Sequence, residues 1–192
     1  MDSWDELADW SRALNRDPRA FASIFDHHEG RVFRHSLKLV EGYHDAEDVT
    51  AASFFELWRR RERVRIVAGS TLPWLLVTAT NVALNTRRSL RRYRAALDRL
   101  PREAPTERED SAVGSRAEDN EDLYRTIRGL NPTDGSLLML TAVEGIAVNE
   151  AATLLGISDG AARVRLHRAN QRLRAQLITP IEMMRNVEGA GR

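Results

Sequence analysis

Cysteine is absent from the 192-residue sequence, and lysine is almost absent. Without cysteine the chain cannot form disulfides, thiolate zinc sites or iron–sulfur ligands, and it has no thiol nucleophile. No apolar run approaches the roughly 18 residues that a membrane span requires, and the first residues are acidic where a secretory leader would be basic. We therefore expect a cytoplasmic globular protein of one or two domains that makes no membrane contact of its own.

Arginine supplies 28 of the 29 basic residues, with Lys38 as the exception. Arginine holds phosphate with two hydrogen bonds and stacks on bases, so the bias favours nucleic acid, although GC-rich codon usage also produces it. The distribution is more informative than the count. Residues 87–100 carry a net charge of +5 and residues 158–175 carry +4, whereas residues 101–122 carry −5. This pattern predicts two surfaces that face nucleic acid and an acidic connector between them.

Residues 101–122 have the composition of a linker, because they are polar, contain two prolines and show no apolar periodicity. They separate an N-terminal helical block, residues 17–100, from a C-terminal block, residues 123–177. Strand signals are weak in both blocks. The predicted fold is all-α, with two small helical domains joined by a flexible acidic linker.

The N-terminal block has local signals of helix ends. An Asp-Pro pair begins a predicted helix over residues 17–40, and Gly42 ends it. Asp45 is the predicted N-cap of the next helix, residues 46–61, and Pro73 opens a third. The second of these helices is expected to bury a wide apolar face, formed by Phe54, Phe55, Leu57 and Trp58.

Residues 148–177 carry the strongest local pattern. Two adjacent small alanines precede Gly156, which can adopt a left-handed backbone, and Ser158, which can cap a second helix. This pattern predicts a helix-turn-helix, whose second helix enters the major groove of duplex DNA; an arginine-rich helix exposed to solvent is the alternative. The predicted base contacts are Gly160, Ala161, Val164, Arg165 and Arg168, and the predicted phosphate contacts are Arg163, Arg172 and Arg174.

The predicted helix that begins at Pro73 combines an apolar face with a polar one. Amides beside arginines suit the exposed edges of unpaired bases, so this face is a candidate single-strand site. A solvated helix end is the alternative. The candidate residues are Asn81, Asn85, Arg87, Arg88, Arg91 and Arg92.

Two short clusters, His-His-Glu at residues 27–29 and His-Asp-Ala-Glu-Asp at residues 44–48, superficially resemble metal ligands. Acidic residues in a first turn also favour the helix N-terminus electrostatically, which explains them without a metal. A third ligand group at a fixed spacing is missing. We therefore expect neither a metal nor a cofactor.

Three motifs together resemble the extracytoplasmic-function (ECF) sigma factors of bacterial RNA polymerase. Residues 46–50 and 54–58 resemble the first half of the family's conserved region two, residues 74–88 its second half, and residues 150–174 its region four. The resemblance covers about residues 17–177. It implies a sigma factor that is not an enzyme and that binds core RNA polymerase through the β′ and β subunits.

The resemblance also implies a role for each region. Region two would bind the β′ coiled coil through the face around Asp48, Thr50 and Glu56. Asn81 and the nearby arginines would capture the non-template single strand of the minus-ten element, and region four would read the duplex minus-thirty-five element. Because such factors are commonly held inactive by an anti-sigma protein, a partner of that class is expected.

Other interpretations remain open at this point. Alanines occupy positions 51 and 52, where the family usually has Gln-Glu or similar, which leaves room for a sigma-like interaction module. A helix-turn-helix regulator that acts without polymerase is a second alternative. The acidic residues 1–17 are either a docking segment or a disordered end. The remaining alternative is an enzyme acting on a nucleotide through His27, His28, Asp45, Glu47 and Asp48.

Overall fold

The computed structural model describes residues 4–97 and 118–189, which form helices in two compact units, residues 1–114 and 115–192. The only strand-like pairing within these described ranges is an isolated bridge between Val67 and Ser70. The all-α fold with two helical domains is therefore confirmed. Among the described helices, none is long and apolar enough to cross a membrane.

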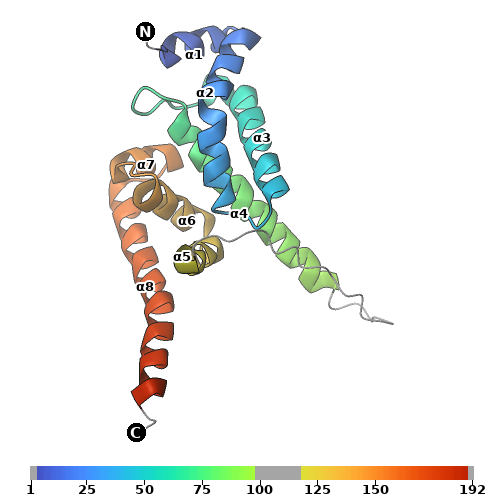
Figure 1. Cartoon of the computed structure of the whole chain (residues 1–192). Coiled ribbons are helices and arrows are strands. Elements are labelled where there is room, and N and C mark those ends of the chain that lie inside the picture. The colour runs from blue at the N-terminus through green and yellow to red at the C-terminus, as the bar shows by residue number, and fades with distance from the viewer. Residues whose placement is uncertain (1–3, 98–117, 190–192) are drawn as a thin grey trace. The chain divides into compact units, whose positions relative to one another are not determined.

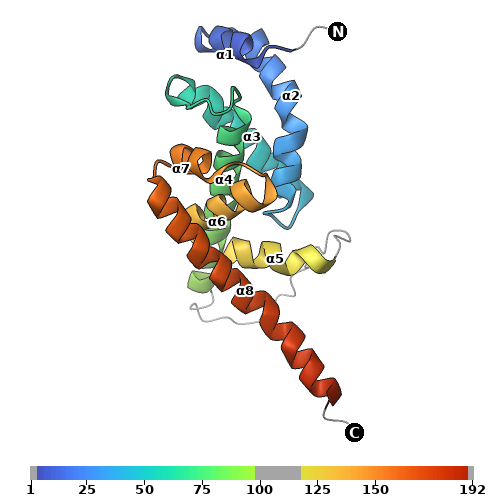
Figure 2. The same ribbon diagram turned by 90° about the vertical axis from the view of Figure 1, so that its left-hand side faces the viewer.

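In unit 1, three long helices lie side by side and a short one lies across the end at which the second helix begins (Figures 1 and 2). Helix α2 packs against α3 and α4, and α1 packs against α2. A 3₁₀ turn, η1, follows α3. The bounds are α1 Glu6–Leu14, α2 Pro18–Leu37, α3 Tyr43–Arg60, η1 Arg61–Arg63 and α4 Leu72–Leu97.

The predicted helix starts in unit 1 are partly confirmed. Asp17 is the N-cap of α2, and its carboxylate accepts hydrogen bonds from two backbone N–H groups of the first turn. The prediction of Asp45 as the N-cap of α3 is wrong, because α3 begins at Tyr43. The carbonyl of Gly42 already accepts the N–H of Ala46 at 3.2 Å, so the first turn has formed before Asp45 is reached.

The core of unit 1 mixes apolar side chains with internally bonded polar ones. Nε2 of His35 lies 2.8 Å from Oγ1 of Thr80, and both side chains are buried. Phe55 does not belong to this core as expected, because it is 64% exposed. The largest fully buried apolar side chains here are Ile24, Leu39, Leu57, Leu75 and Leu76.

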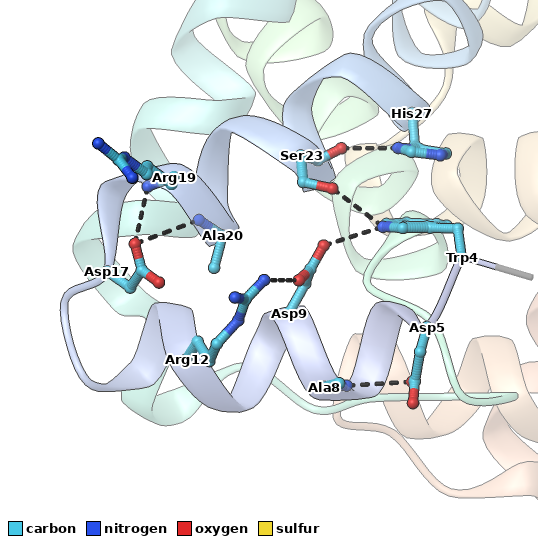
Figure 3. A network of polar contacts seen from close by, with 10 residues as sticks. All are labelled: Trp4, Asp5, Ala8, Asp9, Arg12, Asp17, Arg19, Ala20, Ser23 and His27. Carbon is cyan, nitrogen blue, oxygen red and sulfur yellow. Dashed lines mark hydrogen bonds and ion pairs between the residues drawn. The ribbon is translucent and has the colours of Figure 1, made fainter. Parts of the chain in front are cut away.

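The acidic N-terminal segment is folded onto α2 from residue 4, so a disordered end is excluded for this part (Figure 3). The indole N–H of Trp4 donates to Asp9 at 2.9 Å and to Ser23 at 3.0 Å. Hydrogen bonds from Ser23 and Trp4, and the ion pair with Arg12, lower the pKa of Asp9 to about 2. The ring of His27 stacks on Trp4 at 3.7 Å between centroids.

Glu6 connects α1 to the loop before α4. Its Oε1 accepts both the backbone N–H and the hydroxyl of Thr71 at 2.6 Å, and it lies 3.0 Å from Nε2 of His28. Burial raises the pKa of Glu6, but the contacts with His28 and Thr71 outweigh this effect and lower the pKa to about 2. The charged form of Glu6 therefore stabilises the fold of unit 1.

Unit 2 contains four helices and a π-helical turn, η2, within its described residues. Helices α6 and α7 pack against the first half of α8, which continues beyond them (Figure 2). The bounds are α5 Glu118–Gly129, α6 Pro132–Leu138, η2 Met139–Val143, α7 Val148–Leu155 and α8 Asp159–Gly189.

The predicted C-terminal end of the linker, residues 101–122, is wrong because it overlaps helix α5. The helix begins at Glu118, so residues 118–122 are helical, whereas residues 101–117 lie outside the described part of the chain. Acidic residues lowered the helical signal in the sequence. In a first turn, however, they interact favourably with the helix dipole, so their presence there does not oppose a helix.

The turn between α7 and α8 has the helix-ending and helix-capping residues that the sequence predicts. Gly156 adopts the left-handed conformation, with φ 67° and ψ 31°, and ends α7. The hydroxyl of Ser158 accepts the N–H of Ala161 at 3.2 Å and caps α8. Ala152 and Ala162 are fully buried, which lets the two helices approach closely. The predicted helix-turn-helix is present.

Candidate nucleic-acid interfaces

A groove of about 540 Å³ opens between α3 and α4 in unit 1; we call it the α3–α4 groove. Its lining combines aromatic, amide and hydroxyl groups, a combination that can stack on unpaired bases and hydrogen-bond to their edges. The exposed Phe55 ring is the largest apolar surface on the α3 side. The lining residues from the two helices include Phe55, Glu56, Trp74, Thr78, Asn81 and Asn85.

Four of the predicted single-strand residues lie on one stripe of α4. Asn81, Asn85, Arg88 and Arg92 follow each other at intervals of four, three and four residues, which places them on one side of the helix. Both amides line the α3–α4 groove, and both arginines are exposed further along the helix. The side chain of Arg91 lies outside those that the structure describes.

Arg87 does not join this stripe, although it was predicted to act with Arg88. It is rotated by about 200° from Asn85 around the helix axis. Its guanidinium lies 3.1 Å from the carboxylate of Glu41, and only 24% of its side chain is exposed. The structure therefore separates Arg87 from the α3–α4 groove.

The three predicted polymerase contacts do not share one surface of α3. Asp48 is exposed, whereas Thr50 is only 4% exposed and donates its hydroxyl to the carbonyl one turn earlier. Thr50 therefore offers almost no surface for a direct contact, although it borders a small hollow beside Tyr43 and Glu47. Glu56 lines the α3–α4 groove and pairs with Arg59 at 2.7 Å and Arg60 at 2.6 Å. The hydrogen bond from Arg59 lowers the pKa of Glu56.

In unit 2, the second helix of the helix-turn-helix presents a convex, basic face. Ala162 and Ala169 face the core, and the predicted DNA-contacting residues lie on other sides of α8. Val164 is 51% exposed, as a residue that contacts a thymine methyl group must be. The exposed residues that were predicted to contact DNA are Gly160, Arg163, Val164, Arg165, Arg168, Arg172 and Arg174; Ala161 is partly exposed.

Arg165 differs from the other arginines of this face because it is paired inside unit 2. Its NH1 lies 3.0 Å from Oδ1 of Asp134 on α6, and 44% of its side chain is exposed. Arg165 lies at the edge of the exposed face, which brings it within reach of α6. Arg168 follows three residues later and lies nearer the centre of that face.

Sequence reasoning missed Phe55 as a candidate binding residue and assigned it to the core. A signal was present, because Phe55 shares a stripe of α3 with Asp48, Ala52 and Arg59, at intervals of four, three and four residues. A stripe that contains two charged residues faces solvent. Asp134 was also missed, and no local pattern could have paired it with Arg165, which is 31 residues away.

The two histidine-containing clusters make other contacts. His44 pairs with Glu47 at 3.0 Å, and His27 stacks on Trp4. Within the described parts of the chain, no group of three His, Asp or Glu side chains is placed to hold a metal ion.

Comparison with protein families gives two matches, one in each unit. Residues 24–93 match Sigma-70 region 2, and residues 120–173 match Sigma-70, region 4. The first match contains the α3–α4 groove, and the second contains the helix-turn-helix. Residues 1–23, with α1 and the beginning of α2, lie outside both.

Curated relatives resemble the chain over most of its length. RNA polymerase sigma factor CarQ of Myxococcus xanthus is 33% identical over 171 residues, covering 85% of this chain and 92% of CarQ. ECF RNA polymerase sigma factor SigE of Mycolicibacterium smegmatis is 30% identical over 185 residues, covering 92% of this chain but only 62% of SigE. Among solved structures, the sigma factor RpoE of Bartonella quintana, in complex with the anti-sigma factor NepR, has the same fold. The two structures superpose with a TM-score of 0.55 at 18% sequence identity, and the alignment covers 82% of this chain and 96% of RpoE.

Proposed function

We propose that this chain, which belongs to the extracytoplasmic-function family of RNA polymerase sigma factors, directs core RNA polymerase to promoters by binding DNA in two forms. Unit 1 holds a single strand, and unit 2 holds duplex. The observation that carries this proposal is the contrast between a concave groove of aromatic and amide groups and a convex helix face of arginines.

The α3–α4 groove suits a single strand because its groups need unpaired bases. An aromatic ring stacks on a base only when the base has left the duplex, and each such contact contributes about 1–3 kcal/mol. Asn81 and Asn85 add amides that donate and accept hydrogen bonds at base edges. Unstacking a base costs a few kcal/mol, so a groove that binds only the melted strand shifts the promoter toward the open form.

The exposed face of α8 suits duplex DNA. A convex helix fits the major groove, where arginine pairs with guanine and an apolar side chain contacts the thymine methyl group. In this proposal Val164 and Arg168 read bases, while Arg163 and Arg172 bind phosphates and fix the orientation of the helix. Unit 2 thereby binds the minus-thirty-five duplex while unit 1 binds the melted minus-ten strand.

The chain needs partners to carry out this task. A small module buries less than the area typical of a specific protein–DNA interface, which is roughly 1,000 Å² or more, so the two units bind a promoter tightly only when core polymerase holds both of them. Exposed Asp48 is the proposed contact for the β′ subunit, and an anti-sigma protein is the proposed inhibitor. The chain itself catalyses no reaction and acts in the cytoplasm.

Two adjacent arginines provide a matched test. Arg88 lies on the groove stripe, whereas Arg87 pairs with Glu41 on another side of α4. With core polymerase and a promoter selected from genomic DNA, Arg88→Ala is expected to slow promoter opening roughly 3- to 10-fold, the effect of losing one hydrogen bond of ordinary strength. Arg87→Ala is expected to change it little, and both variants should bind polymerase normally. Equal opening by the Arg88 variant and the parent would refute the assignment of the groove.

A further inference from the structure

A second hollow of about 730 Å³ opens in unit 1, and we call it the arginine basin. Arginines reach it from two parts of the chain: from the turn between α1 and α2, and from the end of α3 with η1. Trp74 of α4 contributes an aromatic wall. The arginines of the lining are Arg16, Arg59, Arg60, Arg61 and Arg63.

The arginine basin carries an excess of positive charge. Glu56 pairs with Arg59 and Arg60, and Glu62 is the one acidic residue in the lining. Five positive charges against these two negative ones leave a net charge of +3 at the basin. Like charges gathered in a hollow repel each other unless an anion joins them, and they concentrate anions from solution.

Two of these arginines are held in place by the fold. The guanidinium of Arg61 lies 4.6 Å from the centre of the Trp58 ring and donates to the Trp58 carbonyl at 2.7 Å. Arg16 has φ 65°, in the left-handed region, and its N–H donates to the carbonyl of Ala13 at 3.0 Å. A non-glycine residue in that region costs about 1–2 kcal/mol, and the turn between α1 and α2 holds Arg16 there at the edge of the basin.

The arginine basin adjoins the α3–α4 groove, because Arg60 and Trp74 line both hollows. We propose that the basin binds phosphates of the same DNA strand whose bases lie in the groove, so that the two hollows form one continuous single-strand site. This inference rests on the proposed function of unit 1. It gives the N-terminal segment a role in DNA binding, because Arg16 lies outside the residues that match Sigma-70 region 2.

The test uses the full chain and a fluorescent oligothymidine of about 16 nucleotides, the upper end of single-strand site sizes. Affinity is measured over a range of salt concentrations, because each lost phosphate contact lowers the salt slope of single-strand binding by about 0.7. Arg16→Ala with Arg63→Ala is expected to lower that slope by about 1.4. The control, Arg31→Ala with Arg34→Ala, removes the same charge from exposed positions of α2 and is expected to leave the slope nearly unchanged.

Three results would contradict the proposal that the basin binds phosphates of the strand. These are an unchanged slope in the Arg16 and Arg63 variant, an equal fall in the control variant, or two strands bound per chain instead of one. Inorganic tripolyphosphate tests whether the basin is instead a site for free polyphosphate. In that case tripolyphosphate would bind to the chain without displacing the oligothymidine. Phe55→Ala separates this inference from the proposed function. If that variant binds the strand normally while the basin variant does not, the groove assignment fails and the basin stands.

Discussion

The two units use arginine in different ways. In unit 1, Arg59 and Arg60 share Glu56 within α3, and Arg87 of α4 pairs with Glu41, so these cations are paired inside the unit. In unit 2, the α8 arginines that were predicted to contact DNA are exposed, and within the described part of the unit only Arg165 among them forms an ion pair, with Asp134. In our proposal, the same residue type therefore serves a concave single-strand site in one unit and a convex duplex-binding face in the other.

The cores differ in a related way. Unit 1 buries polar groups that reach across helices, such as Glu6 with Thr71 and His35 with Thr80. Unit 2 buries a run of large apolar side chains, residues 137–140, beside small alanines of α7 and α8. We therefore expect acid to act first on unit 1, which depends on a buried carboxylate.

The largest expected effect concerns Glu6. The folded pKa of Glu6 is about 2, below its ordinary value of 4.5, so as pH falls the unfolded chain takes up the proton first. About 1–3 kcal/mol of stability, present above pH 5, is therefore lost as pH falls to about 2, because solvent screens part of the interaction. Glu6→Gln should be less stable at pH 7 and should flatten this pH dependence, with Asp9 supplying the remaining slope. All four tryptophans lie in unit 1, so their fluorescence follows its unfolding.

The control for Glu6 is Glu47→Gln, which changes an exposed carboxylate of α3. It should leave the acid transition of unit 1 in place. If the Glu6 variant unfolds with the same pH dependence as the parent, the contact between Glu6 and Thr71 does not stabilise unit 1.

The next effect concerns base stacking in the α3–α4 groove. Phe55→Ala is expected to weaken binding of the melted promoter strand by about 1–3 kcal/mol, or roughly 5- to 150-fold, with duplex binding unchanged. Tyr43→Ala removes another exposed aromatic ring of α3, one that packs on Phe33 outside this groove. Equal losses from the two substitutions, measured with polymerase on a forked promoter template, would show that the groove has no special role.

A comparable effect is expected on α8, where two exposed arginines are assigned different contacts. Arg168→Ala should cost about 1–3 kcal/mol on the preferred duplex and relax the preference at one base pair. Arg163→Ala should weaken binding to all duplexes alike and lower the salt slope by about 0.9. Selection from a randomised duplex library measures the base preference, and affinities over a range of salt concentrations give the slope. Interchanged results would reverse the two assignments.

The smallest expected effect concerns Asp134, which holds Arg165 by a partly exposed ion pair. Such pairs contribute about 0–1 kcal/mol. Asp134→Ala removes a negative charge beside the duplex-binding face and releases Arg165, so duplex affinity should rise severalfold at low salt. The melting temperature checks that the fold is intact. Weaker duplex binding by this variant would indicate that Asp134 positions Arg165 for DNA.

The parts of the fold that depend on local chemistry could be predicted from the sequence. Asp17, Gly156 and Ser158 have the predicted roles because helix caps depend on a few neighbouring residues. Which side of α3 faces the core was predicted less well, because Thr50 is buried and Phe55 is exposed. Apolar and polar residues alternate irregularly along this part of the sequence, so the buried side depends on how α3 packs against its neighbours.

Pairs between distant segments could not be predicted at all. Arg87 is held by Glu41 and Arg165 by Asp134, and these contacts change which arginines face DNA. The arginine basin depends in the same way on Arg16 meeting the end of α3. The matches to both sigma regions support a polymerase-associated sigma factor over the alternative of a helix-turn-helix regulator that acts without polymerase.

Photocrosslinking tests most directly whether the two units bind two forms of DNA. A benzophenone side chain is placed at position 55 in the α3–α4 groove or at position 164 on α8, in the complex with core polymerase and a promoter. We predict that position 55 crosslinks the non-template strand only after the promoter melts, and that position 164 crosslinks upstream duplex before and after melting. Crosslinking of position 55 to closed duplex DNA, or of position 164 to the melted strand, would contradict the account.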